Sequence, residues 1–109
     1  MSGGVQVPKI GVVIPAYNEE KNIGKTIEDI LPYTGDIVVI NDGSKDKTKQ
    51  VIEKYPVKLI HRNKNLGLAK TVAEGFRYLL KNGYEYGIKM DADGQMDASK
   101  LKEFFETVN

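Results

Sequence analysis

The feature that most restricts the fold of this chain is a regular alternation of two apolar patterns. Short continuous apolar runs, rich in Val and Ile, predict four strands, at 9–14, 36–41, 57–60 and 86–90. Apolar residues at helical spacing predict four helices, at 23–31, 46–54, 67–81 and 97–108. Each predicted strand is therefore followed by a helix. Continuous apolar strands in this arrangement are typical of a parallel sheet that is covered on both faces.

Right-handed crossovers between such strands predict the order 3-2-1-4 in a Rossmann-like, three-layer α/β/α fold with a mostly parallel sheet. In that order the direction in which the sheet grows reverses between strands 1 and 4. Ligands of these sheets bind beyond the carboxyl ends of the strands, at this switch point. The segments directly after Ile14, Ile40 and Met90 are therefore the places to look for a site.

Composition limits the kinds of partner. The 109 residues suit one small domain, with 1–8 expected to be a flexible N-terminus and 9–109 the folded part. The 16 basic residues nearly cancel the 15 acidic ones, so no nucleic-acid partner is expected. The absence of Cys excludes disulfides and thiolate metal sites. No apolar run approaches the roughly 20 residues that span a bilayer, and no signal peptide is recognised, so a cytoplasmic location is expected.

Two carboxylates stand at the end of the fourth predicted strand. Asp91 and Asp93 are two residues apart and would repel each other without a nearby cation. Hard divalent ions such as Mg²⁺ or Mn²⁺ take oxygen ligands, often one or two carboxylates together with water and substrate phosphates. The alternative is an Asp-Gly turn at Asp93 and Gly94, since these residues are common in turns. The position at the predicted switch point favours the metal site.

The first and second strands end in groups that suit a nucleobase. Tyr17 follows the first strand among polar residues, so its ring is expected to be an exposed stacking surface. Asp42 follows the second strand and is expected to accept a hydrogen bond from a base N–H. The neighbouring polar residues are interpreted as helix caps, with Asn18 on the first helix and Ser44 or Asp46 on the second.

The start of the third predicted helix is a favourable place for a phosphate, because of its free N–H groups and the helix dipole. Lys64 or Lys70 would add positive charge there, and Asn65 would cap the helix. A solvated basic loop remains open as the alternative. Along the same helix, apolar spacing predicts a face that points to the core, made of Leu68, Val72, Phe76, Leu79 and Leu80.

Four segments, in the same order along the chain, resemble the signature motifs of family 2 glycosyltransferases, which have the GT-A fold. They are Ile14-Pro15-Ala16-Tyr17-Asn18-Glu19; Asn41-Asp42-Gly43-Ser44 with Asp46 and Thr48; Asn65 with Gly67, Ala69 and Gly75; and the D-x-D segment Asp91-Ala92-Asp93-Gly94-Gln95. Each motif alone is weak, whereas four in order are specific. The resemblance extends from about residue 9 to 105.

This resemblance implies the donor-binding half of a metal-dependent, inverting hexosyltransferase. It implies a site for a UDP- or GDP-linked sugar, made of Pro15, Ala16, Tyr17, Glu19, Asp42, Lys70, Asp91, Ala92 and Asp93. Asp93, together with Asp91, would hold Mg²⁺ or Mn²⁺ at the diphosphate. The residues of these motifs are similar to those of family members that act on polyprenyl phosphates or build surface glycans. Full-length relatives of that kind are expected at the cytoplasmic face of the membrane.

The resemblance also implies that part of the catalytic machinery lies elsewhere. Family members are roughly twice as long, and their second half contains the general base and the acceptor site, so no catalytic residue is assigned in these 109 residues. The chain alone is expected to bind nucleotide without transferring sugar. Its fourth strand would then be an open sheet edge beside an apolar last helix, which predicts a homo-oligomer.

Two other classes of function fit parts of the pattern. A nucleotide-binding α/β module that transfers nothing would use the same pocket. A phosphate-transfer enzyme with Asp91 as nucleophile is disfavoured, because haloacid-type phosphatases have Asp-x-Asp after the first strand, followed by Thr. Here the motif follows the fourth strand and is followed by Gly94 and Gln95. The triplet 24–26 is not a P-loop either, because Glu19 stands where that motif needs Gly.

Overall fold

The computed structural model describes residues 9–94 and 103. The strands are β1 (Ile10–Ala16), β2 (Ile37–Asp42), β3 (Lys58–Arg62) and β4 (Tyr86–Lys89), and the helices are α1 (Ile23–Ile30), α2 (Thr48–Ile52) and α3 (Leu68–Lys81). All strand pairs are parallel and their order is β3-β2-β1-β4, so the predicted topology is confirmed. The predicted flexible segment at 1–8 and, apart from Glu103, the predicted helix at 97–108 lie outside the described residues.

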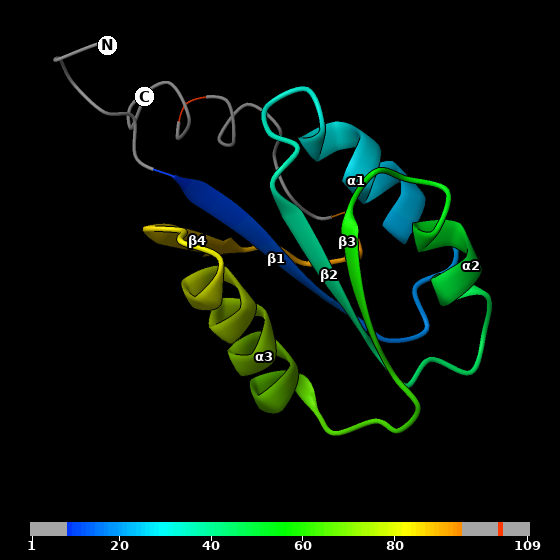
Figure 1. Cartoon of the computed structure of the whole chain (residues 1–109). Helices are drawn as coiled ribbons and strands as arrows, with labels where there is room; N and C mark the ends of the chain where they lie inside the picture. The colour runs from blue at the N-terminus through cyan, green and yellow to red at the C-terminus, as the bar shows by residue number, and fades with distance from the viewer. Residues whose placement is uncertain (1–8, 95–102, 104–109) are drawn as a thin grey trace, which may run out of the picture.

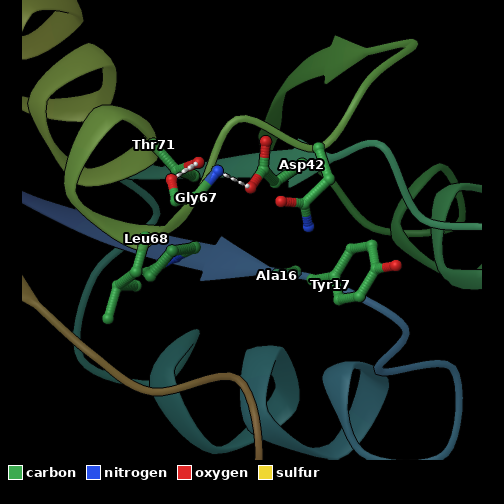
Figure 2. A pocket seen from close by; sticks show the side chains of 8 residues that line it. Ala16, Tyr17, Asp42, Gly67, Leu68 and Thr71 are labelled. Carbon is green, nitrogen blue, oxygen red and sulfur yellow. Dashed lines mark hydrogen bonds between the residues drawn. The ribbon is translucent and has the colours of Figure 1, made fainter.

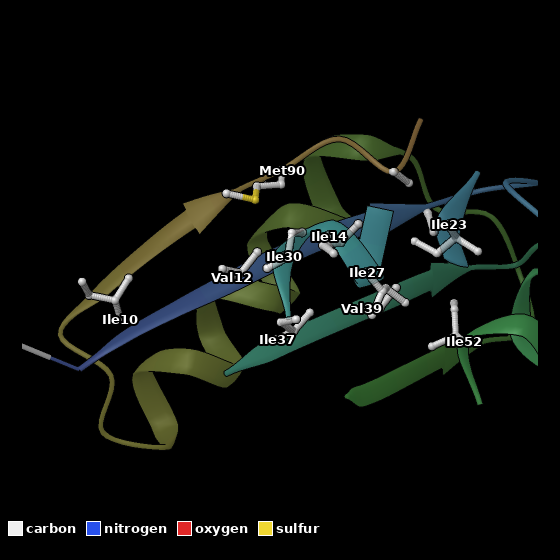
Figure 3. Packing of buried hydrophobic residues seen from close by; sticks show 12 residues of the cluster. Ile10, Val12, Ile14, Ile23, Ile27, Ile30, Ile37, Val39, Ile52 and Met90 are labelled. Carbon is white, nitrogen blue, oxygen red and sulfur yellow. The ribbon is translucent and has the colours of Figure 1, made fainter. Parts of the chain in front are cut away.

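The sheet is the middle of three layers, with α1 and α2 on one face and α3 on the other (Figure 1). Successive residues of a strand point to opposite faces, and the strands are apolar on both. On the face towards α1, Val12 and Ile14 of β1 are fully buried and belong to one cluster with Ile23 and Ile27 of α1 (Figure 3). Among the described residues, this cluster is the larger of two cores, and it includes residues of both interior strands, β1 and β2.

The face towards α3 has a smaller core, formed by Val13, Val38, Ile40 and Leu79. Here the helix lies very close to the sheet, because Gly75 faces the strands. A Cβ atom at this position would lie 2.4 Å from a methyl carbon of Val13 and 2.8 Å from one of Ile40, which is too close for any other residue without rearrangement.

The predicted inward face of α3 is partly wrong. The buried residues of this helix are Thr71, Gly75 and Leu79. Of the five side chains predicted to face the core, Leu79 is buried, Val72 is half-buried, and the other three, Leu68, Phe76 and Leu80, are exposed. The rotation of the helix follows the residue that allows the closest approach to the sheet rather than the largest apolar side chains.

β4 is an edge strand within the described residues, since it pairs with β1 alone. Phe76 of α3 covers Gly87 of β4 so closely that a Cβ there would meet its ring. Leu80, one turn along α3, is 76% exposed, and Tyr86 of β4 is 58% exposed. Tyr86 pairs with Ile10, which belongs to the core towards α1, so its side chain lies on the other face of the sheet from α3. We call Phe76 and Leu80 of α3 the edge patch. It is an apolar surface beside an open sheet edge.

Candidate nucleotide site

A pocket of about 310 Å³ opens where β1 and β2 end and α3 begins (Figure 2). It is lined by Pro15, Ala16, Tyr17, Asp42, Asn65, Gly67, Leu68 and Thr71. This is the carboxyl edge of the sheet, where the strand order predicts a ligand site. Four of the predicted site residues, Pro15, Ala16, Tyr17 and Asp42, are therefore brought together at one pocket.

The structure adds four lining residues that are not in the predicted site, Asn65, Gly67, Leu68 and Thr71. Leu68 was expected in the core, but it is 60% exposed at the mouth of the pocket. Thr71 is one turn further along α3 and is buried, with its hydroxyl donating to the Gly67 carbonyl at 2.7 Å. A polar residue on the buried face of a helix, one turn from its start, was the signal that could have identified this wall.

The loops after β1 and β2 are joined by side chains. The Asn18 N–H donates to Ser44 Oγ at 2.9 Å, and Asn18 Oδ1 accepts from the Lys45 N–H at 2.8 Å. The Glu19 N–H donates to Thr48 Oγ1 at 2.8 Å. Asn18 has a positive φ of 53°, which Asn tolerates better than most residues. These bonds hold the turn that contains Tyr17, a residue that is 41% exposed.

Three of the four predicted caps are wrong as a consequence. α1 begins after Asn22, so Asn18 does not cap it, and Ser44 is bound to the other loop. α3 begins after Gly67 without a side-chain cap bond, so Asn65 does not cap it. α2 begins after Lys47, so Asp46 is not at the N-cap position either, but its carboxylate does accept from the Thr48 N–H, the first amide of α2, at 2.9 Å.

Asp42 is 4% exposed, and its carboxylate is bound to the chain itself. Oδ1 accepts from the Leu66 N–H at 2.9 Å. Oδ2 accepts from the Gly67 N–H at 3.0 Å (Figure 2). Arg62 lies 3.4 Å from Oδ1. Burial raises the pKa of Asp42, but these two amides, the Thr71 hydroxyl and the Arg62 charge together outweigh burial and leave the pKa below its ordinary value. Asp42 is thus an ionised group that anchors the loop before α3.

Glu19 and Lys70 do not line the pocket. The Glu19 carboxylate accepts from Asn22 Nδ2 at 3.2 Å, and the carbonyl of Glu19 accepts from the Ile23 N–H at 2.9 Å, so this residue organises the start of α1. Lys70 lies exposed in the first turn of α3, where its carbonyl accepts from Arg62 at 3.2 Å.

The D-x-D segment follows β4 at the same edge of the sheet. Ala92 is buried, and its carbonyl accepts from Thr26 Oγ1 at 3.0 Å, so the backbone between the two carboxylates is fixed. Asp91 and Asp93 are exposed, and Asp91 pairs with Lys89 at 2.8 Å. This alternation leaves the carboxylates accessible while the residue between them is anchored.

The donor chemistry of this segment suits Mg²⁺ or Mn²⁺. In the described part of the chain, no cluster of three or more His, Asp or Glu side chains could hold a metal by itself. Asp91 and Asp93 supply two hard oxygen ligands, and these ions commonly complete such a set with water and substrate phosphates. The residues therefore fit a metal that is shared with a phosphate ligand rather than one enclosed by protein.

The parallel sheet, its strand order and the pocket at its carboxyl edge define a Rossmann-like class of fold. The model of the family described as Glycosyl transferase family 2 matches residues 11–109, so the chain belongs to this family. None of the helices in 9–94 or at 103 is long and apolar enough to cross a membrane.

Curated relatives agree with this assignment. The chain is 41% identical over 107 residues to an uncharacterized protein, MJ0544, of Methanocaldococcus jannaschii, covering 89% of this chain and 47% of that protein. It is 34% identical over 110 residues to dolichol-phosphate mannosyltransferase of Pyrococcus furiosus, covering 92% of this chain and 30% of that protein. It is 32% identical over 108 residues to undecaprenyl-phosphate mannosyltransferase of Micrococcus luteus, covering 92% of this chain and 44% of that protein. The chain spans less than half the length of each of these relatives.

Solved structures show the same fold. Glucosyl-3-phosphoglycerate synthase from Mycobacterium tuberculosis in complex with UDP superposes with a TM-score of 0.66 at 23% identity, over 84% of this chain and 35% of that one. Its complex with Mn²⁺, UDP-glucose and phosphoglyceric acid gives a TM-score of 0.64 at 24% identity, over 84% of this chain and 34% of that one. The expected GT-A fold is therefore confirmed.

Proposed function

We propose that this chain is the donor-binding part of a metal-dependent glycosyltransferase that takes a hexose from a UDP- or GDP-linked sugar. The observation that supports this most is the shared edge of the sheet. The pocket with Tyr17 and Asp42 opens at the ends of β1 and β2, and the accessible carboxylates of Asp91 and Asp93 follow β4 at that edge. A nucleoside diphosphate has a ring at one end and oxygen ligands for a metal at the other, which matches this arrangement.

At the base end, the exposed ring of Tyr17 offers a stacking face. The Asp42 carboxylate already accepts two backbone N–H groups, so it supports the wall of the pocket and has one lone pair on Oδ2 left for a base N–H. Pro15, Ala16 and Leu68 are apolar residues of the pocket wall that would shield a bound base from water.

At the phosphate end, Asp93 and Asp91 would hold Mg²⁺ or Mn²⁺. When bound, this ion would stabilise the negative charge that develops on the departing nucleoside diphosphate. Lys70 would add positive charge from the first turn of α3, and Glu19 would hold the turn that presents Tyr17. Ala92 would keep the two carboxylates in place through its anchored carbonyl.

Transfer with inversion needs a general base, and none is assigned within these 109 residues. The proposal is therefore that the base and the acceptor site belong to the remainder of the longer relatives. Polyprenyl phosphate is the proposed acceptor class, since two relatives are named for dolichol phosphate and undecaprenyl phosphate. A surface glycan is the second acceptor class. A cytoplasmic location stays a prediction.

Calorimetric titration tests the donor site directly. UDP, GDP and their glucose and mannose derivatives are titrated with and without Mn²⁺. We expect either the uridine ligands or the guanosine ligands to bind, and we expect Mn²⁺ to strengthen that binding. Failure of all of these ligands to bind would contradict the proposal. Binding without turnover on any acceptor would fit the donor half and also the alternative, a nucleotide-binding module that transfers nothing. Transfer by a longer chain that includes these residues separates the two.

A further inference from the structure

Arg62, at the carboxyl end of β3, lies behind the pocket rather than in it. Its side chain is 14% exposed, and it does not line the pocket. Its guanidinium donates to the Glu74 carboxylate from Nε at 2.6 Å and again from Nη2. It also donates to the Lys70 carbonyl at 3.2 Å, the Thr71 hydroxyl at 3.3 Å and Asp42 Oδ1 at 3.4 Å. A planar fork with five donors can serve this set of acceptors, whereas a single ammonium group cannot.

These contacts join three elements around the pocket, β2, β3 and α3. Asp42 ends β2, Arg62 ends β3, and the acceptors Lys70, Thr71 and Glu74 belong to the first two turns of α3. The loop at 63–67 has no regular structure and contributes two residues to the pocket wall. It is held from the other side by Asp42, which binds the last two amides of the loop.

We propose that Arg62 is a positioning residue for the base end of the nucleotide site, and that it acts through Asp42 and the start of α3 without touching the ligand. This inference rests on the proposed function of the pocket. A wall built from a loop must be ordered before or during binding, and ordering it in advance removes that cost from the affinity. Arg62 supplies this order, because it fixes the carboxylate that holds the loop and the helix turn that follows it.

A purely stabilising role is the competing explanation, since breaking a buried ion pair destabilises many proteins. The two roles differ in what they change. A positioning role at the base end weakens nucleotide binding in a folded protein and leaves untouched the factor by which Mn²⁺ strengthens binding, because that factor reports on Asp91 and Asp93. A general loosening of the fold changes both quantities.

The experiment compares four variants with the parent chain: Arg62→Gln, Arg62→Lys, Glu74→Gln and Arg77→Gln. Arg77 is an exposed residue of the same helix, so its variant is the matched control for loss of one positive charge. UDP and GDP are titrated with and without Mn²⁺, at a temperature where circular dichroism shows each variant to be folded. We expect Arg62→Gln to weaken nucleotide binding about tenfold, with the Mn²⁺ factor unchanged. Arg62→Lys should recover part of this loss, Glu74→Gln should show a smaller loss, and Arg77→Gln should show none.

Unchanged nucleotide affinity in folded Arg62→Gln would overturn the inference, and so would a parallel loss of the Mn²⁺ factor. If Arg62→Gln does not fold, the Glu74→Gln variant tests the inference instead. It retains Arg62 and weakens the bond between Arg62 and Glu74, which is the strongest contact of Arg62. Weaker nucleotide binding by Glu74→Gln, with the Mn²⁺ factor unchanged, then supports the inference. Unchanged nucleotide binding by this variant overturns it. A parent chain that binds neither UDP nor GDP would refute the proposed function and the inference with it, whereas a parent chain that binds while Arg62 is silent refutes the inference alone.

Discussion

Replacing Asp42 by Ala removes an acceptor that three donors share. The N–H groups of Leu66 and Gly67 would lose their partner, and Arg62 would lose one of its two carboxylates. Asp42 is 4% exposed, so its carboxylate and these donors lie largely away from bulk solvent. The substitution therefore tests whether this carboxylate anchors the fold as well as the pocket.

The magnitude follows from these contacts. A hydrogen bond to a charged group contributes about 1.5–3 kcal/mol, and removing one partner of a buried pair costs about 3–5 kcal/mol. The loss is moderated here, because Arg62 keeps its bonds to Glu74. We expect Asp42→Ala to lower the free energy of unfolding by about 2–4 kcal/mol.

Urea unfolding followed by circular dichroism measures this change, with an unchanged slope as the sign that the compactness of both states is preserved. Asp29→Ala is the matched control, because Asp29 forms a surface pair with the exposed Lys25 and should change stability by less than about 1 kcal/mol. If the two variants are equally stable, the anchoring role derived for Asp42 is refuted. Nucleotide binding should be lost in the Asp42 variant alone.

The pH dependence of stability gives an independent check. The pKa of Asp42 is lower in the folded chain than its ordinary value of 3.8, so the unfolded chain binds the proton more readily. The stability that Asp42 contributes is therefore present above pH 3.8 and is lost as the pH falls through the lowered pKa. The difference between the parent chain and Asp42→Ala should shrink in acid, and a constant difference from neutral pH to acid would contradict the linkage.

The remaining predictions concern the metal, the base and self-association. Asp93→Ala should abolish the strengthening of nucleotide binding by Mn²⁺, and Asp91→Ala should weaken it less; an unchanged Mn²⁺ response in calorimetry would rule out the metal assignment. Tyr17→Ala should weaken nucleotide binding by about 1–3 kcal/mol through lost stacking, with Tyr86→Ala, outside the pocket, as a silent control. Equal effects would count against Tyr17 as a base platform. The edge patch beside β4 should make the chain a homodimer or larger, and Leu80→Lys should shift it towards monomer. Light scattering that gives a monomer for the parent chain at high concentration would contradict this.

The topology could be predicted because it depends on patterns that are local in the sequence. Continuous runs such as 37–40 have no polar face, so they fit only strands that are buried on both sides. The preference for right-handed crossovers then leaves few orders for four such strands. The same reasoning placed the segments after the first, second and fourth strands at one edge of the sheet, because the carboxyl ends of parallel strands share one edge.

The hydrogen-bond partners of the polar residues could not be predicted in this way. Asn18, Ser44 and Asn65 each stand before a helix and were expected to cap it, since a sequence offers only its own neighbours as partners. In the fold, the loops after β1 and β2 lie side by side, and Asn18 binds residues 26 and 27 positions away. The amides before α3 are bound by Asp42, which is 24 and 25 positions away.

The orientation of α3 was also decided by tertiary packing. Its apolar residues define a broad stripe, and several rotations of the helix would bury part of it. Gly75 selects one of these, because only a residue without Cβ lets the backbone approach Val13 and Ile40. That rotation buries Thr71 and exposes Leu68 at the pocket. Sequence alone thus determined which segments meet at the carboxyl edge, while the distance of closest approach between helix and sheet decided which side chains form the walls.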